Sequence, residues 1–210
     1  MSATSASRAC VFALALLLAP ALAGATEPPA EDRARIGEGV GHDVRGRIAV
    51  NQAAGSGNAQ TNLAAIAFSA GGTGLVDMRA SQHPATAVDR SRAAHAQIDD
   101  AAFAGSHGVL SINQVAGSGN AQANLFGIGQ YPLDGTPGAS AIDGLDDAAL
   151  AAVAGDTPSG STDTTVRIRQ ARIADEAFRG SQGVVQVNQT AGVGNLSTNA
   201  IVLQLPGGTP

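Results

Sequence analysis

Residues 108–128 read GVLSINQVAGSGNAQANLFGI, and this stretch occurs three times in the chain in diverged form. Residues 46–66 (GRIAVNQAAGSGNAQTNLAAI) and 183–203 (GVVQVNQTAGVGNLSTNAIVL) align with it without gaps. Eight of the twenty-one columns are identical in all three copies: a leading Gly, the pattern NQ-x-AG-x-GN, and a final Asn. Repeats of this kind are typical of stacked folds in which each copy supplies one supersecondary unit. The sequence therefore predicts three copies of one structural unit.

Alternating side chains predict β-strands on both sides of a glycine-rich turn. In the middle copy, Leu110, Ile112 and Gln114 fall on one face of the first strand. Ser111 and Asn113 fall on the other face, which is the period of two expected of a strand. The turn holds paired glycines, which adopt positive φ at little cost. We expect each copy to be a strand, a turn and a strand, and such a hairpin is only marginally stable until it stacks on neighbours.

The amide side chains recur in every copy, while the apolar positions between them vary in type. If the copies stack in register, identical amides lie one strand spacing apart and hydrogen-bond along the stack, as in cross-β assemblies. A buried amide is costly unless it is hydrogen-bonded, and identical neighbours in each layer meet that need. The predicted ladder residues are Asn51, Gln52, Asn58, Asn62, Asn113, Gln114, Asn120, Asn124, Asn188, Gln189, Asn195 and Asn199. The predicted turn glycines are Gly55, Gly57, Gly117, Gly119, Gly192 and Gly194.

The chain divides into a leader, three repeats and two linkers. Residues 1–25 combine Arg8, an apolar run and small residues before Thr26, a pattern typical of a secretory signal peptide. The alignment extends upstream to Ile36 and its counterparts, each ten residues before the leading Gly. We therefore expect a segment at 26–35, repeats at 36–68, 98–130 and 166–210 (with the C-terminal tail), and linkers at 69–97 and 131–165. The linkers are expected to be exposed excursions, flexible or partly helical, with a weakly helical stretch at 141–154.

Composition excludes several classes of function. The only cysteine is Cys10, so the exported chain has no disulfide to stabilise it. After residue 25 the chain has 11 Arg and 17 acidic residues, a net charge of 11 − 17 = −6, which argues against nucleic acid as a partner. No later segment is a candidate membrane span. The four histidines are scattered without ligand spacing, and no constellation of an enzyme is present. We expect no catalytic site, metal or cofactor.

These observations predict an all-β fold, a β-solenoid of three stacked strand-turn-strand layers, secreted or at the cell surface by way of the periplasm. Three units leave two open strand edges, at the first and third copies, and open edges are surfaces for self-association. Two hypotheses follow. The chain is either a subunit that polymerises by strand stacking, or a solenoid that stays monomeric and acts as an adhesin or binding module.

The three repeats and the leader together resemble the Fap class of functional-amyloid fibre subunits, and more distantly the curlin repeats. The resemblance is carried by residues 50–62, 112–124 and 187–199. It implies a stacked β fold, export through the outer membrane by a dedicated exporter, and polymerisation into biofilm fibres with copies of itself or related subunits. Major Fap subunits carry a C-terminal cysteine pair, which residues 206–210 lack. This departure leaves open a minor fibre component and a Fap-like adhesin of another system.

Overall fold

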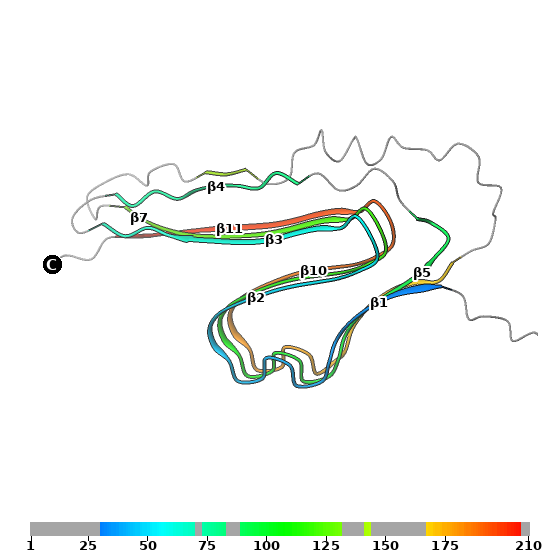
Figure 1. The fold of residues 1–210 in the computed structure, drawn as a ribbon. Coiled ribbons are helices and arrows are strands. Elements are labelled where there is room, and N and C mark those ends of the chain that lie inside the picture. The colour runs from blue at the N-terminus through cyan, green and yellow to red at the C-terminus, as the bar shows by residue number, and fades with distance from the viewer. Residues whose placement is uncertain (1–29, 70–72, 83–88, 132–140, 144–166, 207–210) are drawn as a thin grey trace, which may run out of the picture.

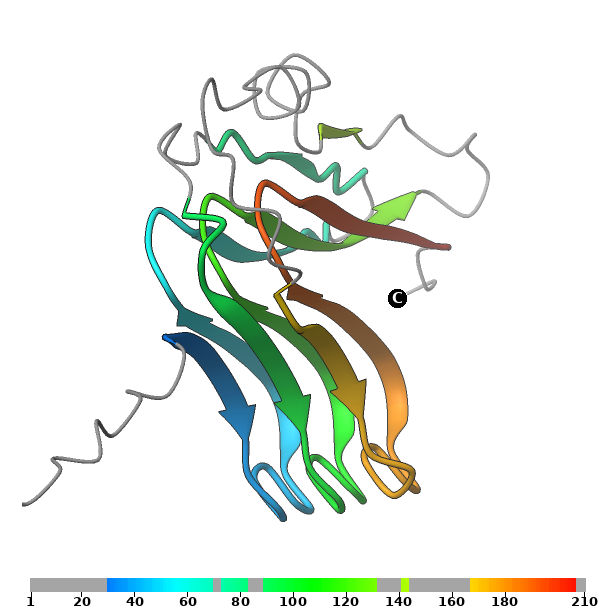
Figure 2. The ribbon, with the colours of Figure 1, turned by 90° about the vertical axis from the view of Figure 1, so that its right-hand side faces the viewer.

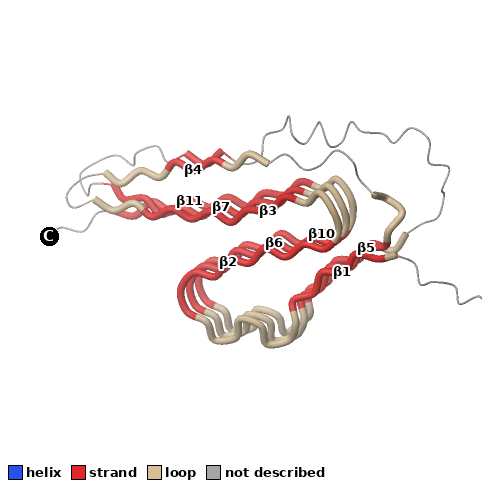
Figure 3. Tube along the Cα trace, in the orientation of Figure 1, coloured by secondary structure: helices blue, strands red, loops and turns tan. Residues whose placement is uncertain are grey.

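The computed structural model describes residues 30–69, 73–82, 89–131, 141–143 and 167–206, and the predicted signal peptide lies outside these ranges. Every regular element in the described ranges is a β-strand (Figure 3). Each copy of the repeat supplies three strands, which together form one layer. Layer 1 holds β1 (Glu31–Ile36), β2 (Arg45–Ala54) and β3 (Ala59–Ile66); layer 2 holds β5 (Ala93–Ile98), β6 (His107–Ala116) and β7 (Ala121–Tyr131); layer 3 holds β9 (Arg169–Ile173), β10 (Gln182–Ala191) and β11 (Leu196–Pro206).

The layers stack as three parallel, in-register sheets. The sheet orders are β1-β5-β9, β10-β6-β2 and β11-β7-β3, so layer 2 is the middle strand of each sheet. Gln52 pairs with Gln114, and Gln114 pairs with Gln189, which is the register of the sequence alignment. Seen along the stack, the three chain paths nearly superimpose (Figure 1), and the view turned by 90° shows them side by side (Figure 2). The predicted all-β, three-layer stacked fold is confirmed.

The turn within each copy joins strands of different sheets. We expected a hairpin, but β2 hydrogen-bonds to β6 and not to β3, and β3 pairs with β7. Strands β2 and β3 therefore meet through their side chains, as an arch. The period of two fits both arrangements, because it reports only that successive side chains point to opposite faces. The arch is favoured here because both faces of β6 carry side chains that can be buried, and β6 is buried from Leu110 to Ala116.

The sheet of β1, β5 and β9 is an element that our strand-turn-strand unit did not include. The upstream alignment had marked its last residues, Ile36, Ile98 and Ile173, which pair in register. An eight-residue arch then leads to the next strand, and there the ring of Phe103 stacks on that of Phe178 with centroids 5.5 Å apart. Phe103, Ile98 and Leu110 form the centre of the main apolar cluster.

Part of the first linker is buried and not exposed as expected. Residues Val76 and Met78 are 3% and 6% exposed and pack on Leu125 of β7. Strand β4 (Asp77–Arg79) pairs in parallel with β8 (Ala141–Asp143), so these two segments form a small sheet over β7. The linker is held there because the outer face of β7 is apolar and would otherwise face water. The helix expected at 141–154 is wrong for its first three residues, and 144–154 lies outside the described ranges.

Candidate functional site: amide ladders and open layer edges

The Gln52, Gln114 and Gln189 column runs as a hydrogen-bonded ladder between the first and second sheets. The amide nitrogen of Gln114 donates to the side-chain oxygen of Gln52 at 2.8 Å, and Gln189 donates to Gln114 at 2.8 Å. The same nitrogens also donate across the gap, Gln114 to the carbonyl of Gln97 at 2.8 Å. Gln114 is fully buried. The ladder thus satisfies the amide in two directions, along the stack and between sheets.

Two asparagine columns face each other between the second and third sheets. Within layer 2, Asn124 Nδ2 donates to Asn113 Oδ1 at 3.0 Å, and both residues are fully buried. Along the stack, Asn113 donates to Asn51 and receives from Asn188, each at 3.0 Å. The Asn62, Asn124 and Asn199 column is bonded in the same way, with both steps at 3.0 Å. These columns therefore form a two-dimensional amide network, in which the structure brings the predicted asparagines together.

The third predicted column lies at the turn. Asn120 Nδ2 donates to Asn58 Oδ1 at 2.9 Å, and Asn195 Nδ2 donates to Asn120 Oδ1 at 2.8 Å. The backbone N–H of Asn120 also donates to Asn58 Oδ1 at 3.0 Å, so this column fixes the entry into the following strand. All six predicted turn glycines have positive φ, from 65° to 147°.

Sequence reasoning missed one amide pair in the gap between the second and third sheets. Gln60 Nε2 donates to Gln122 Oε1 at 2.9 Å, and Gln122 Nε2 donates to the Thr190 hydroxyl at 3.1 Å. The signal was present in two copies, but the third copy has Ser197 in this column, so the residues do not recur in all three.

The four recurring ladders all run in the same direction. In each, the amide nitrogen of one layer donates to the amide oxygen of the layer before it, so the donors point toward layer 1. At the layer 3 edge, the side-chain oxygens of Gln189, Asn195 and Asn199 accept no hydrogen bond from the described residues. At the layer 1 edge, Asn51 Nδ2 donates to no described residue. The layer 3 edge therefore ends in free acceptors in three of the four columns, since the Asn188 oxygen already accepts from Ser197 and Asn199. At the layer 1 edge the same three columns end in the amide nitrogens of Gln52, Asn58 and Asn62, each of which donates to a backbone carbonyl.

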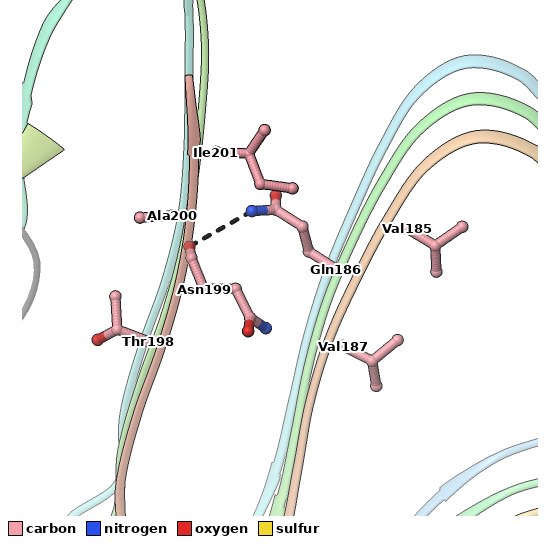
Figure 4. A pocket seen from close by; sticks show the side chains of 7 residues that line it. All are labelled: Val185, Gln186, Val187, Thr198, Asn199, Ala200 and Ile201. Atoms are coloured by element: carbon pink, nitrogen blue, oxygen red, sulfur yellow. Dashed lines mark hydrogen bonds between the residues drawn. The ribbon is translucent and has the colours of Figure 1, made fainter. Parts of the chain in front are cut away.

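The layer 3 edge also carries a shallow groove of ≈ 380 Å³ between β10 and β11. Gln186 and Asn199 point toward one another across it, and Gln186 Nε2 donates to the Asn199 carbonyl at 3.3 Å (Figure 4). Val185 and Val187 point away on the far side of β10. The groove is thus the open end of the gap between the second and third sheets. Inside the molecule, the next layer covers the corresponding amides of layers 1 and 2.

The described residues offer no other chemistry of note. In those ranges, no group of three or more His, Cys, Asp or Glu is placed to hold a metal ion. No helix there is long and apolar enough to cross a membrane.

Comparison with known proteins agrees with the stacked amide architecture. The functional amyloid protein FapB/FapC family matches residues 20–206. The chain belongs to this family. As a FapB/FapC family member it is a subunit of an amyloid fibre and not an enzyme, and Fap amyloids are extracellular biofilm fibres that self-associate. No solved structure matches the chain.

Proposed function

We propose that this FapB/FapC family chain is a minor subunit of its extracellular fibre and joins the fibre head to tail. Layer 1 of one molecule adds to layer 3 of the molecule before it, which is a copy of itself or a related subunit. The mechanism is templated strand addition. The predicted amide columns and turn glycines carry it, and no covalent chemistry is involved.

The observation that carries this proposal is the common direction of the ladders. In a head-to-tail contact, Gln52 of the incoming molecule meets the free oxygen of Gln189, as Gln114 meets Gln52 inside the molecule. A head-to-head contact would set acceptors against acceptors or donors against donors. Because an amide without a partner is costly once buried, only the head-to-tail contact extends the three ladders that end in a free oxygen at layer 3. Such a heterologous contact does not close on itself and produces an open filament.

Glycine columns support the same geometry. A Cβ on Gly108 would collide with the carbonyl of Gly46, and a Cβ on Gly183 would collide with the carbonyl of Gly108. At Gly46 itself the corresponding space is open. The positive φ of 106° already favours glycine at position 46, and a layer 3 lying against it would add the close backbone approach found at Gly108 and Gly183.

The minor role and the route of export rest on sequence. Residues 196–210 contain no cysteine pair, unlike the major Fap subunits that the repeats resemble. The signal-like residues 1–25 fit passage through the periplasm to an outer-membrane exporter.

Fibre formation by the purified full-length chain tests the main claim. We expect thioflavin binding and fibre diffraction with reflections at about 4.7–4.8 Å and about 10 Å. A protein that stays monomeric by analytical ultracentrifugation at high concentration, with neither signal, would support the adhesin instead. For the minor role, the chain is mixed with a major Fap subunit. We expect this chain to make up a small molar fraction of the resulting fibres. Its incorporation in amounts equal to the major subunit would contradict the minor role.

A further inference from the structure

We infer that Arg169 of one molecule forms an ion pair with Asp32 of the next molecule in the fibre. The inference rests on the proposed head-to-tail contact and adds the charged contact that sets its direction and register. Its two members are the first and last residues of one column, in which Asp32 pairs with Ala94 and Ala94 with Arg169.

Asp32 is a buried carboxylate with one oxygen free. It lies on the inward face of β1, only 5% exposed, although layer 1 is the end of the stack. Its Oδ1 accepts from Arg92 Nε at 2.8 Å. Its Oδ2 has no partner among the described residues. A buried, half-satisfied carboxylate is costly, so a second donor at this position is strongly favoured.

Arg169 is an unpaired cation in the same column at the opposite edge. It is exposed, and within the described part of the chain it makes no hydrogen bond or ion pair. Both ends of the column reach the same row of turn glycines. A Cβ on Gly55 would lie 2.8 Å from Asp32 Oδ2, and a Cβ on Gly192 would lie 3.5 Å from Arg169 Cδ. The two side chains therefore occupy equivalent places in their layers.

The two residues can meet only between molecules. Inside one molecule the buried Ala94 separates them by two strand spacings. When layer 1 of the next molecule lies on layer 3, their backbones become direct neighbours about 4.8 Å apart. The Asp32 carboxylate, whose Oδ2 is enclosed beside Gly55 in the single molecule, then turns toward the edge to meet the Arg169 guanidinium.

The pair also opposes the wrong orientation. A head-to-head contact brings two copies of the same layer edge together, so it sets no Asp32 beside an Arg169 and loses the ion pair. The head-to-tail contact does bring Arg35 beside Arg172 in another column of the same sheet. Those side chains point outward, and the Arg35 side chain is 61% exposed, so solvent screens their repulsion.

Charge reversal in the full-length chain tests the pair. We expect Arg169→Asp to slow fibre elongation roughly tenfold or more, because it sets two carboxylates against each other. Arg172→Asp is the control on the same strand with the same change in charge. It faces outward toward Arg35 of the next molecule, so we expect an unchanged or slightly faster elongation, within about twofold. Far-UV circular dichroism of both monomers confirms that each still folds. Equal elongation by the two variants would overturn the inference.

Cross-linking tests the register independently. Arg33 and Gln170 share the neighbouring outward column, with His95 between them, so they too become adjacent only across the contact. In a Cys10→Ser background, Arg33→Cys with Gln170→Cys is expected to give disulfide-linked ladders of many chains, because about 4.8 Å between Cα atoms suits a disulfide. Each single variant is expected to give no covalent dimer in the fibre.

The outcomes separate the two claims. Fibres in which a single variant cross-links, or in which the double variant does not, would overturn the pair and its register while the fibre itself stands. A wild-type chain that forms no fibre at all would overturn the proposed function and this inference together.

Discussion

Asn124 and Asn113 lie opposite each other across the gap between two sheets, and Asn124 Nδ2 donates to Asn113 Oδ1 at 3.0 Å. The same bond joins Asn62 to Asn51 at 2.8 Å and Asn199 to Asn188 at 2.9 Å. Within each layer, one asparagine pair therefore joins the second sheet to the third. Hydrogen bonds along the stack join the pairs of successive layers. Polar networks that are fully satisfied in this way make a packed interior specific for one register.

Asn113→Ala is expected to destabilise the folded monomer by roughly 2–4 kcal/mol, because Asn124 and Asn188 both lose a buried acceptor. Urea unfolding followed by circular dichroism at low protein concentration measures it. Asn51→Ala is the matched control in the exposed layer, where water replaces the lost partner, and it is expected to cost less than about 1 kcal/mol. Equal losses of stability in the two variants would show that the burial of Asn113 does not determine how much its hydrogen bonds stabilise the fold.

Gly46→Ala is expected to leave the monomer folded but slow elongation on the order of tenfold. The new methyl group has open space in the monomer, but a φ of 106° lies outside the left-handed helical region and costs an alanine about 1–3 kcal/mol. In the fibre the methyl group would collide with the Gly183 carbonyl of the preceding molecule. Within one chain, a Cβ added to Gly183 would collide with the Gly108 carbonyl in the same way. Gly39→Ala, also at positive φ with open space in layer 1, is the control, because its column holds Ala101 in layer 2. A normal rate for Gly46→Ala in a thioflavin elongation assay would contradict the proposed contact.

Phe103→Ala is expected to lower the free energy of unfolding by about 3–5 kcal/mol, since it empties the centre of the main apolar cluster. Phe103 is 1% exposed and stacks on Phe178, whereas Phe68 is 65% exposed. Phe68→Ala therefore serves as the control and is expected to change stability by less than about 0.5 kcal/mol. Similar losses for both in urea titrations would mean that the arch around Phe103 adds little to stability.

Val76→Asp tests whether the first linker covers β7. Val76 is 3% exposed against Leu125, so a carboxylate there is expected to remove roughly 1.5–3 kcal/mol of stability. The adjacent Leu75 is 54% exposed, and Leu75→Asp is expected to be nearly silent. If both variants unfold at the same urea concentration, the linker does not cover the sheet in solution.

Periodicity and repetition carried most of the prediction. The NQ-x-AG-x-GN pattern was sufficient for the strands, the turns and the register, because in-register stacking is what makes an amide at one column useful to the next. The same reasoning did not show that Asn113 and Asn124 face each other, since a hairpin and an arch share one alternation of side chains. The segment around Val76 and Met78 shows no sustained period and contains Gly71, Gly72 and Gly74, so the sequence predicted an exposed linker there.

What the residues alone established is the layer: which positions recur, that they form strands, and that three copies lie one above another, because each of these follows from local alternation and identical columns. The arrangement within the layer was decided by packing between distant segments. The arch between β2 and β3, the extra sheet of β1, β5 and β9, and the column linking Asp32 to Arg169 all depend on which faces bury each other. A one-dimensional pattern specifies how side chains alternate, and only the folded chain shows what each face meets.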